Sequence, residues 1–239
     1  MSDKMHKSTI RALLKGFFDM LPLCLAVLPW GILCGSLAVQ NGFSALETQA
    51  MSLLVFAGSA QLVAIELMAG NTPLLTILFT TLIISSRHFL YGLAIRHKVI
   101  DQPFRWRLPV SFVLTDELFA FSHHRKAYRT KVRLIYALSA GFSFYIAWNI
   151  WTLLGIVAGS LLPDLTHLGL DFAIAATFIA LVIPGVKNLA TLATVITAGV
   201  VATLLKNQGF QLWLVTAALI AMTVGYLISR WQAKEEHTQ

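Results

Sequence analysis

Long apolar stretches separated by clusters of basic residues constrain this chain more than any other feature. About 20 apolar residues, rising 1.5 Å each, make an α-helix long enough to cross a bilayer. Seven stretches reach or approach this length: 17–40, 48–69, 74–95, 134–161, 169–186, 188–205 and 210–230. An eighth, 108–122, is shorter and acidic, so it is either an oblique span or a re-entrant half-helix. The pattern predicts an all-α, polytopic transmembrane helix bundle of seven or eight spans, with residues 1–239 forming a single domain.

The composition supports this class. Only 12% of the residues are charged and 57% are apolar, with a mean hydropathy of +0.73, whereas soluble domains carry about 25% charged residues. The net charge of +7 is concentrated in residues 4–15, 96–107 and 125–133. Such clusters orient helices in a bilayer, so we expect membrane lipid around the chain and no nucleic-acid partner.

The basic clusters do not agree on one orientation of the predicted spans. If 108–122 crosses the membrane, the N-terminus and the 123–133 cluster both face the cytoplasm, but the 96–107 cluster does not. If it does not cross, the two central clusters share a side and the N-terminus opposes them. We favour the first arrangement, with eight spans and a cytoplasmic C-terminus.

Two glycine-containing stretches resemble each other. Residues 31–37 (GILCGSL) are matched by residues 155–161 (GIVAGSL). One interpretation is a duplicated bundle with halves 16–122 and 132–231, as in many secondary transporters. The alternative is that small residues four apart recur because they let membrane helices approach closely.

Polar residues interrupt the second apolar stretch at Phe56-Ala57-Gly58-Ser59-Ala60-Gln61. A helix broken at Gly58 frees backbone donors and acceptors, which suit the carboxylate and ammonium of an amino acid. We predict substrate contacts at Phe56, Gly58, Ser59 and Gln61. The alternative is that Ser59 and Gln61 hydrogen-bond neighbouring helices.

Arg87 lies within the third apolar stretch, followed by His88 and Tyr91. A charge at the centre of a bilayer costs at least about 2.5–3.5 kcal/mol, so Arg87 requires a partner or a wet cavity. Arg87 is a candidate to bind the substrate carboxylate. Tyr91 lies one turn further on the same helix face and is a second candidate for substrate binding. His88 titrates near neutral pH and is a candidate proton carrier. Alternatively, Arg87 extends its head group to the interface.

Asp116 and Glu117 lie in the short stretch 108–122. Adjacent residues point to different helix faces, so the two carboxylates do not form an acid–base dyad. One of them is expected to pair with Arg87 while the other takes up and releases protons. The alternative is a solvated helix start capped by Thr115, since acidic residues favour helix N-termini.

No pattern of an enzyme, metal site or cofactor is present in the sequence. Phosphate-binding glycine loops, zinc-ligand spacings and nucleophile elbows are all missing. Cys24 and Cys34 lie in the first apolar stretch without nearby ligands, so we expect neither a disulfide nor a metal there. Active transport by such a chain would draw on an ion gradient.

Three motifs resemble the AzlC/YgaZ/BrnF family, the large subunits of bacterial branched-chain amino-acid exporters. They are FAGSAQ (residues 56–61), RHFLYG (residues 87–92) and LTDELFA (residues 114–120), in the order and approximate spacing of that family. The first departs from the expected FAGASQ, because Ser59 stands one position earlier.

This resemblance implies a multi-pass protein of the bacterial inner membrane that exports valine, leucine, isoleucine and methionine, driven by the proton motive force. It also implies a small membrane partner of the AzlD/YgaH/BrnE type. The sequence leaves two other classes open, a passive channel and a non-transporting assembly subunit. An intramembrane enzyme is the least favoured reading.

Overall fold

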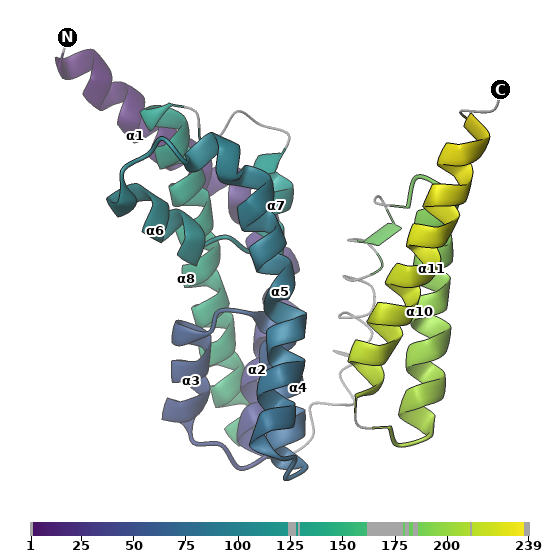
Figure 1. Cartoon of the computed structure of the whole chain (residues 1–239). Coiled ribbons are helices and arrows are strands. Elements are labelled where there is room, and N and C mark those ends of the chain that lie inside the picture. The colour runs from purple at the N-terminus through teal and green to yellow at the C-terminus, as the bar shows by residue number, and fades with distance from the viewer. Residues whose placement is uncertain are drawn as a thin grey trace. The chain divides into compact units, whose positions relative to one another are not determined.

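The computed structural model describes residues 2–123, 128, 130–161, 179, 182–183, 186–210 and 212–236, and its regular elements in that part are helical. The all-α prediction is therefore confirmed for these residues (Figure 1). The helices are α1 (Ser2–Ala26), α2 (Leu28–Gln40), α3 (Ala45–Leu54), α4 (Gly58–Ala69), α5 (Leu74–Val99), α6 (Phe104–Phe112), α7 (Asp116–His123), α8 (Lys131–Leu161), α10 (Leu189–Asn207) and α11 (Trp213–Glu236). They divide into two compact units, Met1–Thr72 with Ile84–Ala173, and Pro73–Ile83 with Ile174–Gln239.

Four of the described helices, α5, α8, α10 and α11, are long and apolar enough to cross a membrane. Helices α1 and α2, which meet at a bend of 54°, are apolar enough to make a fifth if they count together as one broken span. Pro22 within α1 and Pro29 at the start of α2 explain the bend, because proline removes a helical hydrogen bond. The predicted span 169–186 lies almost wholly outside the described residues and stays a prediction. The count of seven or eight spans is not confirmed, and the favoured eight-span arrangement is wrong, because 48–69 and 108–122 turn back as hairpins in the described residues.

Helices α1 and α2 pack lengthwise against α8 through small residues. A side chain on Gly35 would collide with the backbone around Gly155, and one on Gly155 would collide with the backbone of Ile32. A side chain on Gly159 would collide with Ser36. The two matching glycine stretches are thus the two faces of one close helix contact. Duplication of the halves 16–122 and 132–231 remains a prediction.

The second apolar stretch, 48–69, does not form the predicted span. Helix α3 approaches the middle of α8, where the Tyr145 hydroxyl donates to the Leu53 carbonyl over 3.0 Å. Helix α4 then turns back, because the Gln61 amide donates over 2.9 Å to the Ser52 hydroxyl of α3. If α4 continued in the direction of α3, these two side chains would lie more than about 10 Å apart at 1.5 Å per residue. Helices α3 and α4 therefore form a re-entrant hairpin.

The outer end and the tip of this hairpin each have a clear physical basis. Ser44 and Glu47 form a capping box that starts α3, with the hydroxyl donating to the carboxylate over 2.7 Å. These hydrogen bonds hold the pKa of Glu47 below its usual range. At the tip, Phe56 adopts a φ of 44°, a left-handed conformation that reverses the chain before Gly58 starts α4.

The short stretch 108–122 forms a second re-entrant hairpin, α6–α7. A side chain on Gly141 of α8 would meet both Val113, just after α6, and Leu118 on α7. Helix α7 returns along α8 from there, since the rings of Phe121 and Tyr136 stack with centroids 5.7 Å apart. Of the two sequence alternatives, an oblique span and a re-entrant half-helix, the structure has the second.

The two hairpins enter from opposite ends of the unit, and their tips meet halfway along α8. The Phe56 ring at one tip lies 4.9 Å from the Tyr145 ring, and the Phe112 ring at the other lies 5.2 Å from it. In Figure 1, α3 and α4 occupy one end of this unit and α6 and α7 the other. Because neither hairpin crosses the membrane, each returns the chain to the side from which it came.

This topology removes the conflict between the basic clusters. The N-terminal part of α1, the junction of α5 with α6 and the start of α8 all lie at the same end of the unit. That end carries the described basic side chains Arg11, Lys15, Arg96, Lys98, Arg105, Arg107, Lys131 and Arg133. The opposite end carries Glu47 and Glu66 and, among the described residues of this unit, no lysine or arginine. The basic end is therefore expected to face the cytoplasm.

Cysteine labelling in cells tests the re-entrant topology. We expect Gln40→Cys and Thr72→Cys, which flank the first hairpin, to react with a membrane-impermeant maleimide in intact cells. Asp101→Cys, between α5 and α6, should react only after permeabilisation. The native Cys24 and Cys34 are buried and should not react with the maleimide. Labelling of residues 40 and 72 from opposite faces would show that 48–69 spans the membrane after all.

Candidate functional site

The candidate site is built around Arg87, near the middle of α5. One of its terminal nitrogens, Nη2, lies 2.9 Å from Oδ2 of Asp116 and donates over 2.6 Å to the Ser59 hydroxyl. Ser59 is the second residue of α4, and Asp116 is the first residue of α7. The structure thus joins one residue from each of the three polar motifs that the sequence singled out.

Two helix N-termini face each other across Arg87. The first turn of α4 has no side-chain cap, so its backbone N–H groups are left for another acceptor. Helix α7 is capped by Thr115, whose hydroxyl accepts from the Leu118 N–H over 3.4 Å. Helix N-termini carry a partial positive charge, which adds to that of the guanidinium. The two sequence alternatives for this motif, a capped helix start and an ion pair with Arg87, are both present.

The ion pair is accessible and incompletely satisfied. The side chains of Arg87 and Asp116 retain 29% and 12% of their exposure. In the described part of the chain, Arg87 Nε and Asp116 Oδ1 make no hydrogen bond. Unpaired polar atoms are costly in an apolar surrounding. Both atoms are themselves buried, so a ligand would reach them only if the pair rearranged.

Tyr91 and His88 lie beside the ion pair. The Tyr91 ring stacks on Phe119 of α7, with centroids 4.4 Å apart and planes 16° apart. This stack fixes α7 against α5 next to Asp116. His88 places Nδ1 3.1 Å from the Ser85 carbonyl of its own helix, and its ring centroid is 6.1 Å from that of Tyr91. The predicted proton-carrying role of His88 stays a prediction.

Gln61 uses both ends of its side chain to hold the first hairpin together. Its amide donates to Ser52, and its carbonyl oxygen accepts from the Ala57 N–H over 3.3 Å. The Ser52 hydroxyl in turn lies 3.0 Å from that of Thr152 on α8. Gln61 is only 1% exposed. In this structure it positions the Ser59 turn, and its predicted contact with substrate is not tested.

Phe56 and Gly58 shape the tip of the hairpin. Phe56 is buried among aromatic rings, including that of Phe112 from the opposite hairpin at 6.1 Å. A Cβ on Gly58 would come within 2.7 Å of the buried Trp148 ring. The backbone can approach α8 here only because residue 58 has no side chain. These two residues set the position of α4, on which the Ser59 contact depends.

Glu117 is half-buried in the first turn of α7, but the ion pair of Arg87 is made by Asp116. Its predicted role in proton transfer stays a prediction. No cluster of His, Cys, Asp or Glu in the described residues could hold a metal ion.

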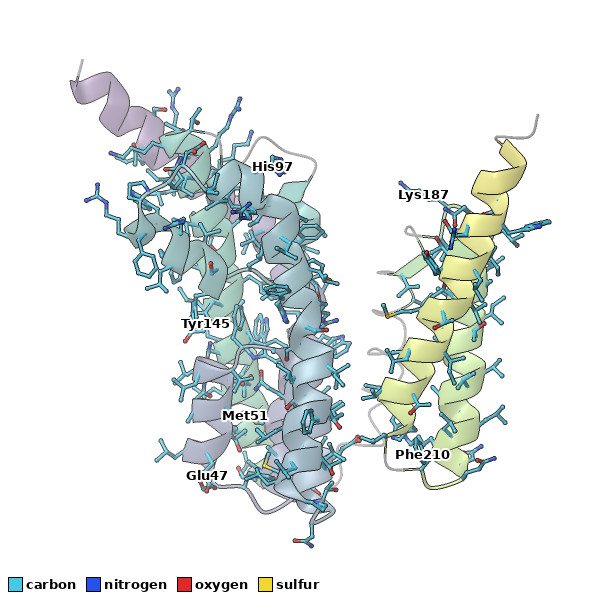
Figure 2. All side chains as sticks on the ribbon, in the orientation of Figure 1. Glu47, Met51, His97, Tyr145, Lys187 and Phe210 are labelled. Atoms are coloured by element: carbon cyan, nitrogen blue, oxygen red, sulfur yellow. The ribbon has the colours of Figure 1, made fainter. Side chains whose placement is uncertain are left out.

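Several residues outside the three motifs also contribute to this arrangement. Ser52 and Thr152 anchor the first hairpin, and Tyr145 contacts both tips. In Figure 2 Tyr145 lies between Glu47 and Met51 towards one end of the unit and His97 towards the other. Asp19, a carboxylate inside the first apolar stretch, accepts from the Tyr136 hydroxyl over 2.6 Å. The sequence could have indicated this residue, because a charged side chain within an apolar stretch requires a partner.

Replacing Gln61 tests its role in holding the hairpin. We expect Gln61→Leu to lower the free energy of unfolding by about 1–3 kcal/mol, because it leaves the buried Ala57 N–H without an acceptor. Thermal unfolding of the purified protein in detergent measures the effect. Gln208→Leu, at the exposed end of α10, is the matched control and should leave the unfolding temperature unchanged. Equal unfolding temperatures for the two variants would contradict the assignment.

Comparison with known proteins shows which family the chain is similar to. The model of the family described as "AzlC protein" matches residues 22–162, which contain both hairpins and Arg87. An uncharacterized membrane protein of Archaeoglobus fulgidus is 32% identical over 92% of this chain and 95% of its own length. The inner membrane protein YgaZ of Escherichia coli is 27% identical over 87% of this chain and 85% of its own length.

The branched-chain amino acid transport protein AzlC of Bacillus subtilis is 28% identical over 68% of this chain and 63% of its own length. No solved structure matches the chain at the level of similarity that identifies these relatives. The family match covers more than half of the sequence, and the relatives extend over most of it. This chain is a multi-pass membrane protein and belongs to the AzlC family.

Proposed function

We propose that the chain is a secondary transporter that exports branched-chain amino acids, with the substrate carboxylate bound at Arg87. The observation that carries the proposal is the bridge from Arg87 to Ser59 and Asp116, where two half-helices begin in the middle of the unit. Broken helices whose N-termini face a central cavity are a common way for transporters to bind anionic groups. The name of the Bacillus subtilis relative supports the choice of substrate.

The geometry suggests how such a substrate would lie. The carboxylate would accept from Arg87 and from the uncapped N–H groups at Gly58 and Ser59. The ammonium group would lie against Asp116, whose Oδ1 makes no hydrogen bond in the described part of the chain. The branched side chain would contact the aromatic surface that includes Tyr91, with Phe56 packed beneath the hairpin tip.

Competition for Asp116 supplies a route for proton coupling. A proton and an ammonium group cannot occupy the same carboxylate, so binding of one displaces the other. A proton that binds Asp116 from the outer side would displace the amino acid there and would then be released into the cell. Each proton that enters would thus be exchanged for an amino acid that leaves. The membrane potential contributes about 2.3 kcal/mol per proton at 100 mV. Glu117 and His88 are the other candidates for carrying this proton.

A small membrane subunit of the AzlD type is part of the proposal. Helices α10 and α11 have spanning windows that are only 6% and 17% buried within the described part of the chain. These apolar faces are suited to lipid or to another membrane helix. We therefore expect transport to require, or to be accelerated by, co-expression of such a subunit.

Efflux of leucine from cells loaded with a leucine-containing dipeptide tests the function. We expect faster efflux when the chain is expressed with its small partner, and loss of that increase with a protonophore. Arg87→Ala should raise the KM for leucine roughly 30-fold or more, because a charged hydrogen-bonded contact is worth at least about 2 kcal/mol. Asp116→Asn should abolish proton-dependent efflux.

Arg133→Gln, an exposed change at the basic end, is the control and should behave like the unchanged protein. The amount of each variant in the membrane is measured by immunoblot. The double variant Arg87→Gln, Asp116→Asn tests whether the protein still folds when both partners of the ion pair are neutral. Normal leucine efflux by both Arg87→Ala and Asp116→Asn would overturn the proposal.

A passive channel is the second candidate, because two re-entrant hairpins meeting from opposite sides can also frame a pore. Such a channel would equilibrate leucine without net movement against its gradient. Efflux that is unaffected by the protonophore and by Asp116→Asn would favour this alternative.

A further inference from the structure

A groove between α5 and α6 opens at the basic end of the unit. It has a volume of about 210 Å³ and is lined by residues of both helices and by Leu114 at the hairpin tip. Its inner end is formed by Gly92 and Leu114. Gly92 lies five residues beyond Arg87 on α5, about 7.5 Å along the helix axis and about 140° around it, and Leu114 is two residues before Asp116.

The outer end of the groove is positively charged. Arg96 and Arg107 line it from opposite helices, and both side chains are exposed. The guanidinium of Arg107 lies 6.0 Å above the Phe104 ring, which orients it. None of the described residues that line the groove is acidic. A cleft of one sign of charge with apolar walls concentrates ions of the opposite sign.

The walls between the two ends are apolar and packed. Ile95 and Val99 of α5 and Val110 of α6 are buried. At Gly92, an added Cβ would meet nothing within 4 Å. The inner end of the groove therefore borders open space at this position.

We propose that this groove is the cytoplasmic entrance for the substrate, with Arg96 and Arg107 attracting its carboxylate before Arg87 binds it. The proposal rests on the proposed transport function and adds the route and the two arginines. It gives a role to the two basic side chains at the outer end of the groove. A contact that served only to pack the two helices would need no basic side chains at this point.

Cysteine modification tests the route. In a background with Cys24→Ala and Cys34→Ala, Gly92→Cys is exposed to an anionic and to a cationic methanethiosulfonate in inside-out vesicles. We expect the anionic reagent to react about tenfold faster, owing to electrostatic attraction by the groove. Arg96→Gln with Arg107→Gln should bring the ratio of the two rates close to one.

Leucine transport by the labelled protein provides the second measurement. Labelled Gly92→Cys should lose leucine transport, because the adduct fills the groove. Leu93→Cys, at the same depth on a different face of α5, is the control and should keep transport after the same treatment.

The outcomes separate the route from the proposed function. Three results would overturn the route while leucine transport by the unlabelled protein stands. They are a Gly92→Cys that does not react, a ratio of reaction rates that is unchanged by Arg96→Gln with Arg107→Gln, and full leucine transport after complete labelling. Absence of leucine transport in the unlabelled protein would overturn the proposed function and the route together.

Discussion

The interaction on which the first unit depends is the contact of Arg87 with Ser59 and Asp116. A guanidinium in the middle of a spanning helix is too costly to leave unpaired, and its partners come from two other helices. Both partners stand at helix starts that exist only because the chain is broken at 55–57 and 113–115. Arg87 therefore links the positions of the two hairpins, and α8 provides the surface against which both tips pack.

The two hairpins also explain the distribution of charge. A hairpin that returns to its own side changes the orientation of every later segment, compared with a helix of the same length that crosses. With both hairpins re-entrant, the basic clusters in the first half of α1, between α5 and α6, and at the start of α8 share one end. The acidic Glu47 and Glu66 lie at the other. The same fold thus places the basic groove at the end of the unit that is expected to face the cytoplasm.

The polar motifs could be found from the sequence because charges and amides stand out in apolar stretches. One of the two carboxylates, Asp116 or Glu117, was predicted to pair with Arg87, and in the structure it is Asp116. The role of Gln61 could not be read in this way, since its partners Ser52 and the Ala57 N–H become neighbours only after the chain reverses. The left-handed Phe56 has no sequence signal strong enough to predict that reversal. An apolar stretch of 22 residues, 48–69, is as consistent with a span as with a hairpin.

The sequence by itself determined that the chain is helical and lies in a membrane, because apolar stretches of this length admit no other structure. It also determined which polar residues require partners. Only the tertiary structure decided which stretches cross and which turn back, because this depends on contacts with α8 made by Leu53, Phe56 and Val113. Those contacts join residues about 30 to 90 positions apart, and no local propensity encodes them.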